Sequence, residues 1–281
     1  MSAVLRTYPA EMPWAIVQVK KQLFALPTQD MREIIMPTES ARVPNVPEYI
    51  LGVINIRGAV MPLLDLRKRI GLPSAGEEVE QFCALMEQRE QDHRKWLGEL
   101  EASVKERRSF GLTTDPHKCA FGKWYDVYRA DDPWIAAQLR KFDAPHQEIH
   151  AIGIEVGRLV SQNANAEAEQ LVARTRYGAL SKMLKLFAEL KDLVQARSRG
   201  VGIILRHDGK PFAVMVDVAL SIEKLLPGAI EEVAELARVK NDGIVRRLAK
   251  RAKTQEIVLL LETDRLLAGF ELAPDFAAPA A

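Results

Sequence analysis

The stretch Gly52-Val53-Ile54-Asn55-Ile56-Arg57-Gly58, followed shortly by Pro62-Leu63-Leu64-Asp65-Leu66-Arg67, reads as two short apolar strands joined by a tight turn. Gly58 suits such a turn because glycine adopts a positive φ, or lets another backbone approach closely, without a steric penalty. Asn55 and Arg57 are candidates for bracing the turn through its backbone groups or for contacting a partner, since guanidinium groups often brace neighbouring loops. The stretch therefore predicts β structure in the first part of the chain.

β character extends to both sides of this turn and returns near the C-terminus. Short apolar runs separated by proline and glycine are typical of strands, and here they cover residues 14–19, 23–26, 50–56 and 59–66. After Gly200, residues 201–205 and 212–216 flank Asp208-Gly209, a strong hairpin signal with His207 beside it. Residues 256–261 are a further strand candidate.

Between these β segments, residues 77–199 read as helix, because glycine becomes rare and charged residues alternate with apolar ones. One apolar stripe recurs at three- and four-residue steps, which is typical of an amphipathic helix. Its members are Leu180, Met183, Leu184, Phe187, Leu190 and Val194. The sequence thus predicts an α+β chain of two modules, in which a helical module interrupts a β module.

The composition excludes several classes of protein. Net charge is +1, from 39 basic and 38 acidic residues, so no bulk charge favours nucleic acid or an anionic membrane. No run approaches the roughly 20 apolar residues that a membrane span needs. Residues 1–13 lack the features of a signal peptide, and two cysteines cannot form a disulfide framework. We therefore expect a soluble cytoplasmic protein.

Four residues form a candidate metal site: His93, Cys119, His146 and His150, which include three of the five histidines and one of the two cysteines. The last two histidines are four residues apart and share one face of a helix. Three imidazoles and one thiolate make a complete tetrahedral set for Zn²⁺, which favours nitrogen and sulfur donors. Because the other ligands are far apart in sequence, we expect them on different helices of a bundle.

Each of these residues also has a structural interpretation, since single histidines and free cysteines are more often packing or surface residues. Cys83 is expected to pack among apolar neighbours, and His117 lies too close to Cys119 to join the same site. A metalloprotease is not expected, because Gln147 occupies the position of the catalytic glutamate and four protein ligands close the coordination shell. No phosphate-binding loop or nucleophile elbow occurs either, so we expect no enzymatic activity.

The surroundings of the four residues add a family resemblance. His93 is followed by Trp96, and Cys119 begins Cys119-Ala120-Phe121-Gly122-Lys123-Trp124, which precedes His146-Gln147-Glu148-Ile149-His150. This order resembles the chemoreceptor zinc-binding (CZB) family. The resemblance implies a four-helix bundle that holds one Zn²⁺ through His93, Cys119, His146 and His150.

The β segments resemble a second family, the CheW-type coupling proteins of bacterial chemotaxis. The resemblance rests on Phe24-Ala25-Leu26-Pro27, Met31-Arg32-Glu33-Ile34-Ile35, the stretch from Gly52 to Arg67, Phe212–Asp217, Leu226-Pro227 and Val258–Leu267. It implies two SH3-like β-barrels, with the bundle inserted at the crossover between them. We expect a first barrel over residues 1–75, a zinc-binding insert over 76–199, a second barrel over 200–272 and a disordered tail over 273–281.

Together, the two resemblances imply an adaptor that couples chemoreceptor cytoplasmic tips to the histidine kinase CheA. The bundle would sense zinc or a hypochlorous-type oxidant, with Cys119 as the redox-sensitive residue, and would signal through the helix 166–199 into the strand near Val201. Asn55, Arg57 and Gly58 would belong to the partner-binding surface or brace their turn. The resemblance also allows a homodimer through the bundle. In the alternative, the protein is a purely structural scaffold, in which zinc only cross-links the helices of the bundle. A metalloenzyme, which needs an open coordination position on the metal, is the least favoured of the three functions.

Overall fold

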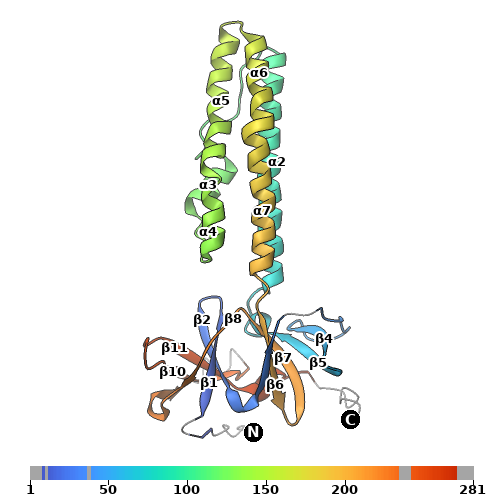
Figure 1. The fold of residues 1–281 in the computed structure, drawn as a ribbon, viewed down its shortest axis with the longest axis vertical. Coiled ribbons are helices and arrows are strands. Elements are labelled where there is room, and N and C mark those ends of the chain that lie inside the picture. Colours follow the sequence, from blue (N-terminus) through green and yellow to red (C-terminus); the bar gives the residue numbers. More distant parts are fainter. Residues whose placement is uncertain (1–7, 10–11, 37–38, 234–241, 271–281) are drawn as a thin grey trace. The chain divides into compact units, whose positions relative to one another are not determined.

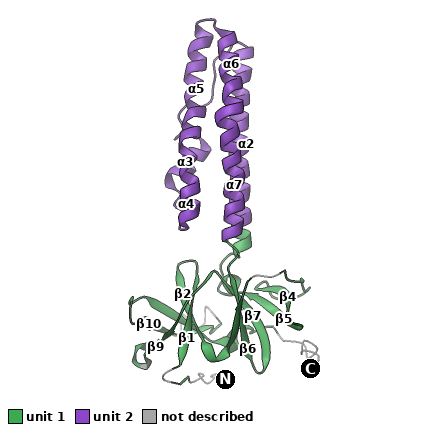
Figure 2. Ribbon diagram, viewed as in Figure 1, with its two compact units in different colours: residues 1–77, 198–281 green, residues 78–197 purple. Residues whose placement is uncertain are grey.

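The computed structural model describes residues 8–9, 12–36, 39–233 and 242–270. The chain divides into two units, of which unit 1 contains residues 1–77 and 198–281 and unit 2 contains residues 78–197 (Figure 2). Unit 2 is thus an insertion in unit 1, close to the predicted insert of residues 76–199. The predicted tail over residues 273–281 lies outside the described residues. Among the described helices, none combines the length and apolar character needed to cross a lipid bilayer.

Unit 1 is built from two β-sheets (Figure 1). The six-stranded sheet has the order β8-β1-β2-β11-β10-β9, and the five-stranded sheet has the order β3-β6-β7-β5-β4. The strands are β1 (Pro13–Val19), β2 (Gln22–Pro27), β3 (Met31–Ile35), β4 (Ile50–Ile56), β5 (Ala59–Asp65), β6 (Val201–His207), β7 (Lys210–Val216), β8 (Val218–Lys224), β9 (Ile230–Glu232), β10 (Val245–Lys250) and β11 (Ile257–Leu261). Two short α-helices, α1 (Leu66–Arg69) and α9 (Thr263–Leu266), each follow a strand.

Both sheets combine strands from the two flanks of the insertion, which corrects the predicted division into a first barrel over residues 1–75 and a second over 200–272. β2 pairs in parallel with β11, and β5 pairs in parallel with β7. Apolar periodicity locates strands but carries no information about such long-range partners. The two sheets are compatible with SH3-like barrels, although within the described residues each runs between two edge strands instead of closing.

The hairpin turns follow the local sequence. Asp208 and Gly209 have φ values of 48° and 79°, and His207 pairs with Lys210 across them, so the predicted hairpin is confirmed. Arg57 and Gly58, with φ of 53° and 86°, form a turn of the same kind between β4 and β5. Positive φ at both central positions matches the right-handed twist of the flanking strands.

An ion pair between Arg67 and Asp217 joins the two flanks. The Arg67 guanidinium donates two hydrogen bonds of 2.7 Å to the Asp217 carboxylate, and the backbone N–H of Lys20 donates a third at 2.6 Å. The carboxylate of Asp65 accepts a bond from the Arg67 N–H and thereby caps α1. These contacts give a physical reason for the Asp65-Leu66-Arg67 motif and for an aspartate after β7.

Contacts within unit 1 also fix the two points at which the insert joins it. Helix α2 (Ala75–Lys105) begins with a capping box, in which Ser74 and Glu77 exchange hydrogen bonds between side chain and backbone at 3.0 and 2.8 Å. Glu77 also pairs with Lys68 of α1 at 2.6 Å. At the returning connection, a side chain on Gly200 would place its Cβ 2.5 Å from the Val216 carbonyl oxygen, so only glycine fits.

Unit 2 consists of helices and the loops between them, with no strand among its described residues and one apolar core. Its helices are α2, α3 (Ala120–Val127), α4 (Pro133–Arg140), α5 (Asp143–Ser161), α6 (Asn165–Thr175) and α7 (Ser181–Arg197), and a π-helical segment, Arg176–Leu180, joins α6 to α7. The predicted helix over residues 166–199 is therefore one continuous column with a π-helical turn. Its stripe faces the core, where Met183, Phe187 and Leu190 are fully buried. Helices α2, α5 and the α6–α7 column are long, and α3 and α4 are short (Figure 1).

We expect Arg67→Ala to lower the free energy of unfolding of unit 1 by about 2 kcal/mol, because the largely buried Asp217 carboxylate loses its charged hydrogen-bond partner and keeps only the Lys20 N–H among the bonds described above. The two side chains are only 13% and 21% exposed. The control is Arg57→Gln, which breaks an ion pair with Glu33 in which the Arg57 side chain is 82% exposed and should change stability by less than about 0.5 kcal/mol. Hydrogen exchange of unit 1 peptides, measured by mass spectrometry across a urea titration, compares the variants, and equal losses would contradict the role assigned to Arg67.

Candidate metal centre

The four predicted metal ligands come together in the core of unit 2. His93 projects from α2, Cys119 immediately precedes α3, and His146 and His150 lie one turn apart on α5. One ligand atom from each of the four residues lies within 4.8 Å of the others. The three imidazoles are buried and the thiol is half-buried. Three separate chain segments therefore converge on one point.

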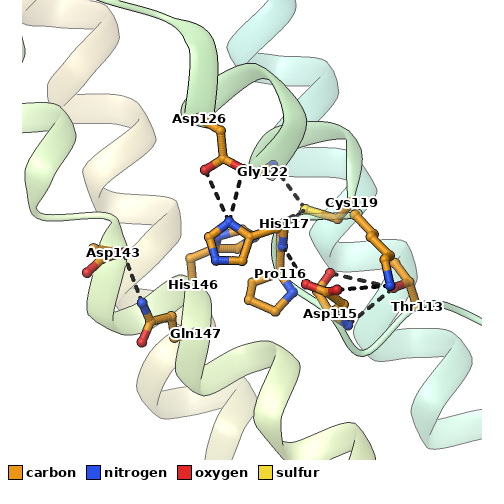
Figure 3. A network of polar contacts seen from close by, with 11 residues as sticks. Thr113, Asp115, Pro116, His117, Cys119, Gly122, Asp126, Asp143, His146 and Gln147 are labelled. Atoms are coloured by element: carbon orange, nitrogen blue, oxygen red, sulfur yellow. Dashed lines mark hydrogen bonds and ion pairs between the residues drawn. The ribbon is translucent and has the colours of Figure 1, made fainter.

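The side chains face one another closely. The Cys119 sulfur is 3.2 Å from Nε2 of His146, a contact that Figure 3 shows from close by. The ring centroid of His93 lies 5.2 Å from that of His146 and 5.8 Å from that of His150. The rings of His146 and His150 are 4.9 Å apart. This spacing places nitrogen and sulfur lone pairs around a small common volume.

Several buried nitrogens in this cluster have no hydrogen-bond partner: Nε2 of His93 and both ring nitrogens of His150. His93 donates from Nδ1 to the Arg89 carbonyl oxygen at 2.7 Å, which leaves Nε2 as a free lone pair directed into the cluster. Leaving buried polar atoms unsatisfied costs roughly 1–3 kcal/mol each. A metal ion would satisfy Nε2 of His93 and one ring nitrogen of His150, because each histidine offers one ligand atom. Three imidazoles with one thiolate suit Zn²⁺, so the residues fit this cofactor.

The electrostatics keep the imidazoles in the form that binds metals. Burial, reinforced by repulsion between neighbouring rings, lowers the pKa of His146 to about 3 and that of His150 to about 4. Burial also lowers the pKa of His93. In Cys119 burial raises the pKa of the thiol, against a lowering contribution from the Gly122 N–H. At neutral pH the metal-free cluster is therefore uncharged, and metal binding requires loss of the thiol proton.

Gly122 positions Cys119. The thiol is the N-cap of α3 and accepts a hydrogen bond from the Gly122 N–H at 3.2 Å. A Cβ at this glycine would lie 1.8 Å from the carbonyl oxygen of Pro116, so the loop before Cys119 can cross the helix only at a residue without a side chain. The sequence contained the Cys-x-x-Gly pattern, but only the structure explains why glycine is needed there.

An aromatic layer surrounds the ligands. Phe121 is buried with its ring 5.7 Å from His93 and 5.0 Å from His146, and Trp96 lies 4.9 Å from His150. The indole N–H of Trp96 donates to the Thr113 carbonyl at 2.8 Å and so fixes the loop before α3. In the sequence, Trp96 is the aromatic residue that follows His93 in the motif. Its spacing of three residues from His93, on the same helix face, is the signal that indicates this role.

Other residues considered in the sequence lie outside the cluster. His117 is exposed and pairs with Asp126 at 3.0 Å (Figure 3). Cys83 is half-buried on α2 near Gln195. In unit 1, the Asn55 side chain accepts a hydrogen bond from the Gly58 N–H at 2.9 Å and so braces the β4–β5 turn.

Comparison with known proteins adds to this geometry. The profile of the CheW-like domain matches residues 14–110, and that of the chemoreceptor zinc-binding domain matches residues 93–156. The chain contains both domains. Unit 2 begins at residue 78, so the shared residues 93–110 belong to the zinc-binding domain and the CheW-like domain is interrupted by it. That domain resumes after the insert, because β6 and β7 complete its five-stranded sheet.

Individual relatives match the CheW-like domain over short stretches. The chain is 47% identical over 49 residues to a chemotaxis protein CheW of Helicobacter pylori, which is 17% of this chain and 30% of that protein. It is 41% identical over 58 residues to a probable chemotaxis protein CheW of Rhizobium etli, which is 21% of this chain and 37% of that protein. The matches thus span about a third of these relatives. The crystal structure of scaffolding protein TtCheW from Thermoanaerobacter tengcongensis aligns with a TM-score of 0.44 and 12% identity, covering 96% of this chain and 95% of that one.

We expect Gly122→Ala to weaken zinc binding about 10- to 100-fold, since the methyl group must displace the Pro116 loop and with it the Cys119 thiol. Competition with a zinc-binding dye measures the affinity. Gly157→Ala is the matched control, because its Cβ would meet nothing within 4 Å on the exposed side of α5 and should only raise helix propensity. Unchanged zinc affinity in Gly122→Ala would contradict the positioning role of this glycine.

We expect the chelator-treated zinc-binding domain to lose stability as pH falls below about 6.5. Folded His146 and His150 titrate near 3 and 4, well below the ordinary value of 6.5, so between these limits the unfolded chain binds more protons. Their stabilising contribution is complete above pH 6.5 and is lost as pH falls through this window. Exposed His117 has a raised pKa and acts in the opposite direction, but as a single group. Urea midpoints from circular dichroism between pH 7.5 and 5 measure the slope, and a flat profile would contradict the burial of neutral imidazoles.

Proposed function

We propose that this protein is a chemotaxis adaptor that couples chemoreceptors to the histidine kinase CheA, and that its inserted domain makes this coupling responsive to zinc or to a hypochlorous-type oxidant. The observation that carries the proposal is the convergence of His93, Cys119, His146 and His150 inside a domain inserted into a CheW-like fold. The CheW-like part supplies the partner surface. The ligand cluster supplies a chemical input, which an adaptor without the insert lacks.

The ligands define what the input can be. Zn²⁺ bound here would keep the Cys119 sulfur as a thiolate and cross-link α2, α5 and the start of α3. Oxidation of that sulfur to sulfenic acid removes the charged ligand and leaves three neutral imidazoles, a much weaker set. Loss of zinc and oxidation of Cys119 thus have the same structural result. Both leave a cluster in which buried nitrogens have no partner.

The ends of the inserted domain support transmission to the CheW-like domain. Helix α2 carries His93 and starts at the Ser74/Glu77 capping box, where Glu77 is paired with Lys68 of α1. The returning column α6–α7 leads through Gly200 directly into β6 of the five-stranded sheet. We propose that changes in the ligand cluster alter the constraint on these two connections. In the CheW-like domain, we propose the exposed Arg57, with Asn55 and Gly58, as part of the partner surface or as the brace of its turn.

The second candidate is a structural scaffold in which zinc only staples the inserted helices. The closed set of three imidazoles and one thiolate, without an open position, favours this role and makes a metalloenzyme the weakest candidate. In either role we propose a cytoplasmic protein, where the thiol stays reduced, and self-association through the helical domain is a further option. The two candidates differ in one respect: a sensor releases zinc or changes partner affinity on oxidation, and a staple does neither.

The deciding experiment measures zinc per chain by mass spectrometry and the affinity for CheA, before and after mild treatment with hypochlorous acid. We expect about one zinc per chain, lost on oxidation together with a change in CheA affinity. Cys119→Ser should bind zinc at least about a hundredfold more weakly, because a thiolate ligand is replaced by a hydroxyl.

Cys83→Ser is the matched control and should behave like the wild type. Retention of zinc through oxidation, or unchanged CheA affinity after zinc loss, would exclude sensing and support the structural scaffold. Wild-type protein that binds no zinc at all would exclude both candidates.

A further inference from the structure

His117 is an exposed histidine at the edge of the metal centre, two residues before Cys119 and outside the set of four ligands. Its side chain is 66% exposed. Beside burial, the charge of His117 contributes to lowering the pKa of His146, so the two rings lie near each other. Pro116, which precedes His117, accepts a hydrogen bond from the Cys119 thiol at 3.3 Å. His117 thus borders both solvent and the Cys119–His146 edge of the cluster (Figure 3).

Asp126 orients the His117 ring in the way that metal-binding histidines are oriented. Nδ1 of His117 lies 3.1 and 3.0 Å from the two carboxylate oxygens of Asp126 (Figure 3). The carboxylate accepts the proton of Nδ1, which leaves Nε2 as the nitrogen with a free lone pair. Nε2 has no hydrogen-bond partner among the residues that the structure describes. A carboxylate on one ring nitrogen is the common companion of a histidine that binds a metal through the other.

The charges around His117 favour a cation. The carboxylates of Asp126, Asp115 and Asp143 all act electrostatically on the ring. Lys118 offsets one of them, since its ammonium group lies 3.2 Å from Asp115. Asp115 also accepts a hydrogen bond from the backbone N–H of His117 at 3.0 Å, which fixes the loop that carries the ring. An excess of negative charge raises the rate at which cations arrive.

We propose that His117 is an entry ligand for Zn²⁺, which binds the incoming ion through Nε2 and passes it to Cys119 and His146. A hydrated ion does not meet four buried or half-buried ligands at once, and Cys119 must lose its proton before its sulfur binds. A ligand held beside the centre keeps the ion at a high effective concentration during these steps. His117 then releases the ion, because four protein ligands complete the shell. The same steps in reverse give zinc a way out.

The test uses the full-length, zinc-free protein, with Zn²⁺ as the probe. Stopped-flow mixing with a fluorescent zinc dye measures the rate of binding, and transfer to an excess of chelator measures the rate of release. The buffer is alkaline enough to keep His117 neutral, because the hydrogen bond to Asp126 raises its pKa. We expect His117→Gln to lower both rates about tenfold and to leave the equilibrium affinity within about twofold of the wild type.

Equal slowing in both directions distinguishes an entry ligand from other roles. Glutamine and neutral histidine carry the same charge, so the slowing cannot come from a change in electrostatic attraction. A resting ligand or a structural support would instead weaken the affinity and speed up release. Unchanged rates, or faster release with weaker affinity, would overturn the proposal.

His207→Gln is the matched control. His207 also lies beside an aspartate, with Nε2 3.3 Å from Asp208, but it belongs to unit 1. Its replacement should leave both rates unchanged. Slowing equal to that of His117→Gln would indicate nonspecific capture of zinc by surface histidines and would overturn the proposal.

This inference rests on zinc binding by the centre, which is part of the proposed function, but not on coupling to CheA. Slower exchange in His117→Gln, with a CheA affinity that does not respond to zinc, supports the entry role and contradicts sensing. Equal exchange rates in His117→Gln and the wild type contradict the entry role and leave sensing intact. Wild-type protein that binds no zinc overturns both.

Discussion

Burial of three imidazole rings beside a thiol imposes the main constraint on the helical domain. Nitrogens of His93 and His150 are removed from water without a protein partner, and a cluster of this kind is unfavourable unless something else compensates. Phe121 and Trp96 pack against the cluster and give it a largely apolar surrounding. A cation coordinated by all four residues would resolve the conflict. The same packing that makes the metal-free cluster unfavourable would then make the stability of the domain depend on the bound metal.

The CheW-like domain is subject to a topological constraint instead. Because β2 pairs with β11 and β5 with β7, neither flank contains a complete sheet. The inserted domain must bring its two ends back to the same place, which a helical module does with little strain. The entropy of closing a long loop rises only slowly with its length, so an insertion of this size is tolerated when its own core orders it. The Arg67–Asp217 pair then secures the junction between the flanks.

Much of this architecture was predictable from local sequence. The hairpin at Asp208-Gly209 and the amphipathic stripe around Phe187 depend on neighbouring residues, and both were predicted correctly. The gathering of the four ligands was predictable because the donor types and the His146/His150 spacing are specific. The pairing of strands across the insertion was not, since it depends on partners about two hundred residues away. Gly122 differs from both. The sequence shows a glycine after Cys119, but the need for a residue without a side chain follows only from the close approach of the Pro116 carbonyl in the structure.

The interleaved sheets have a consequence for synthesis on the ribosome. All four ligands have been made once residue 150 is complete, when almost half of the chain is still to come. The six-stranded sheet cannot be completed before β11, which ends at Leu261. At roughly 5–20 residues per second, the helical domain has several seconds to fold while β1, β2, β3 and β5 still lack their partners from the second flank. The nascent chain thus completes the helical domain before the two β-sheets can form, and early helix formation shortens the distance that the first flank must span to find the second.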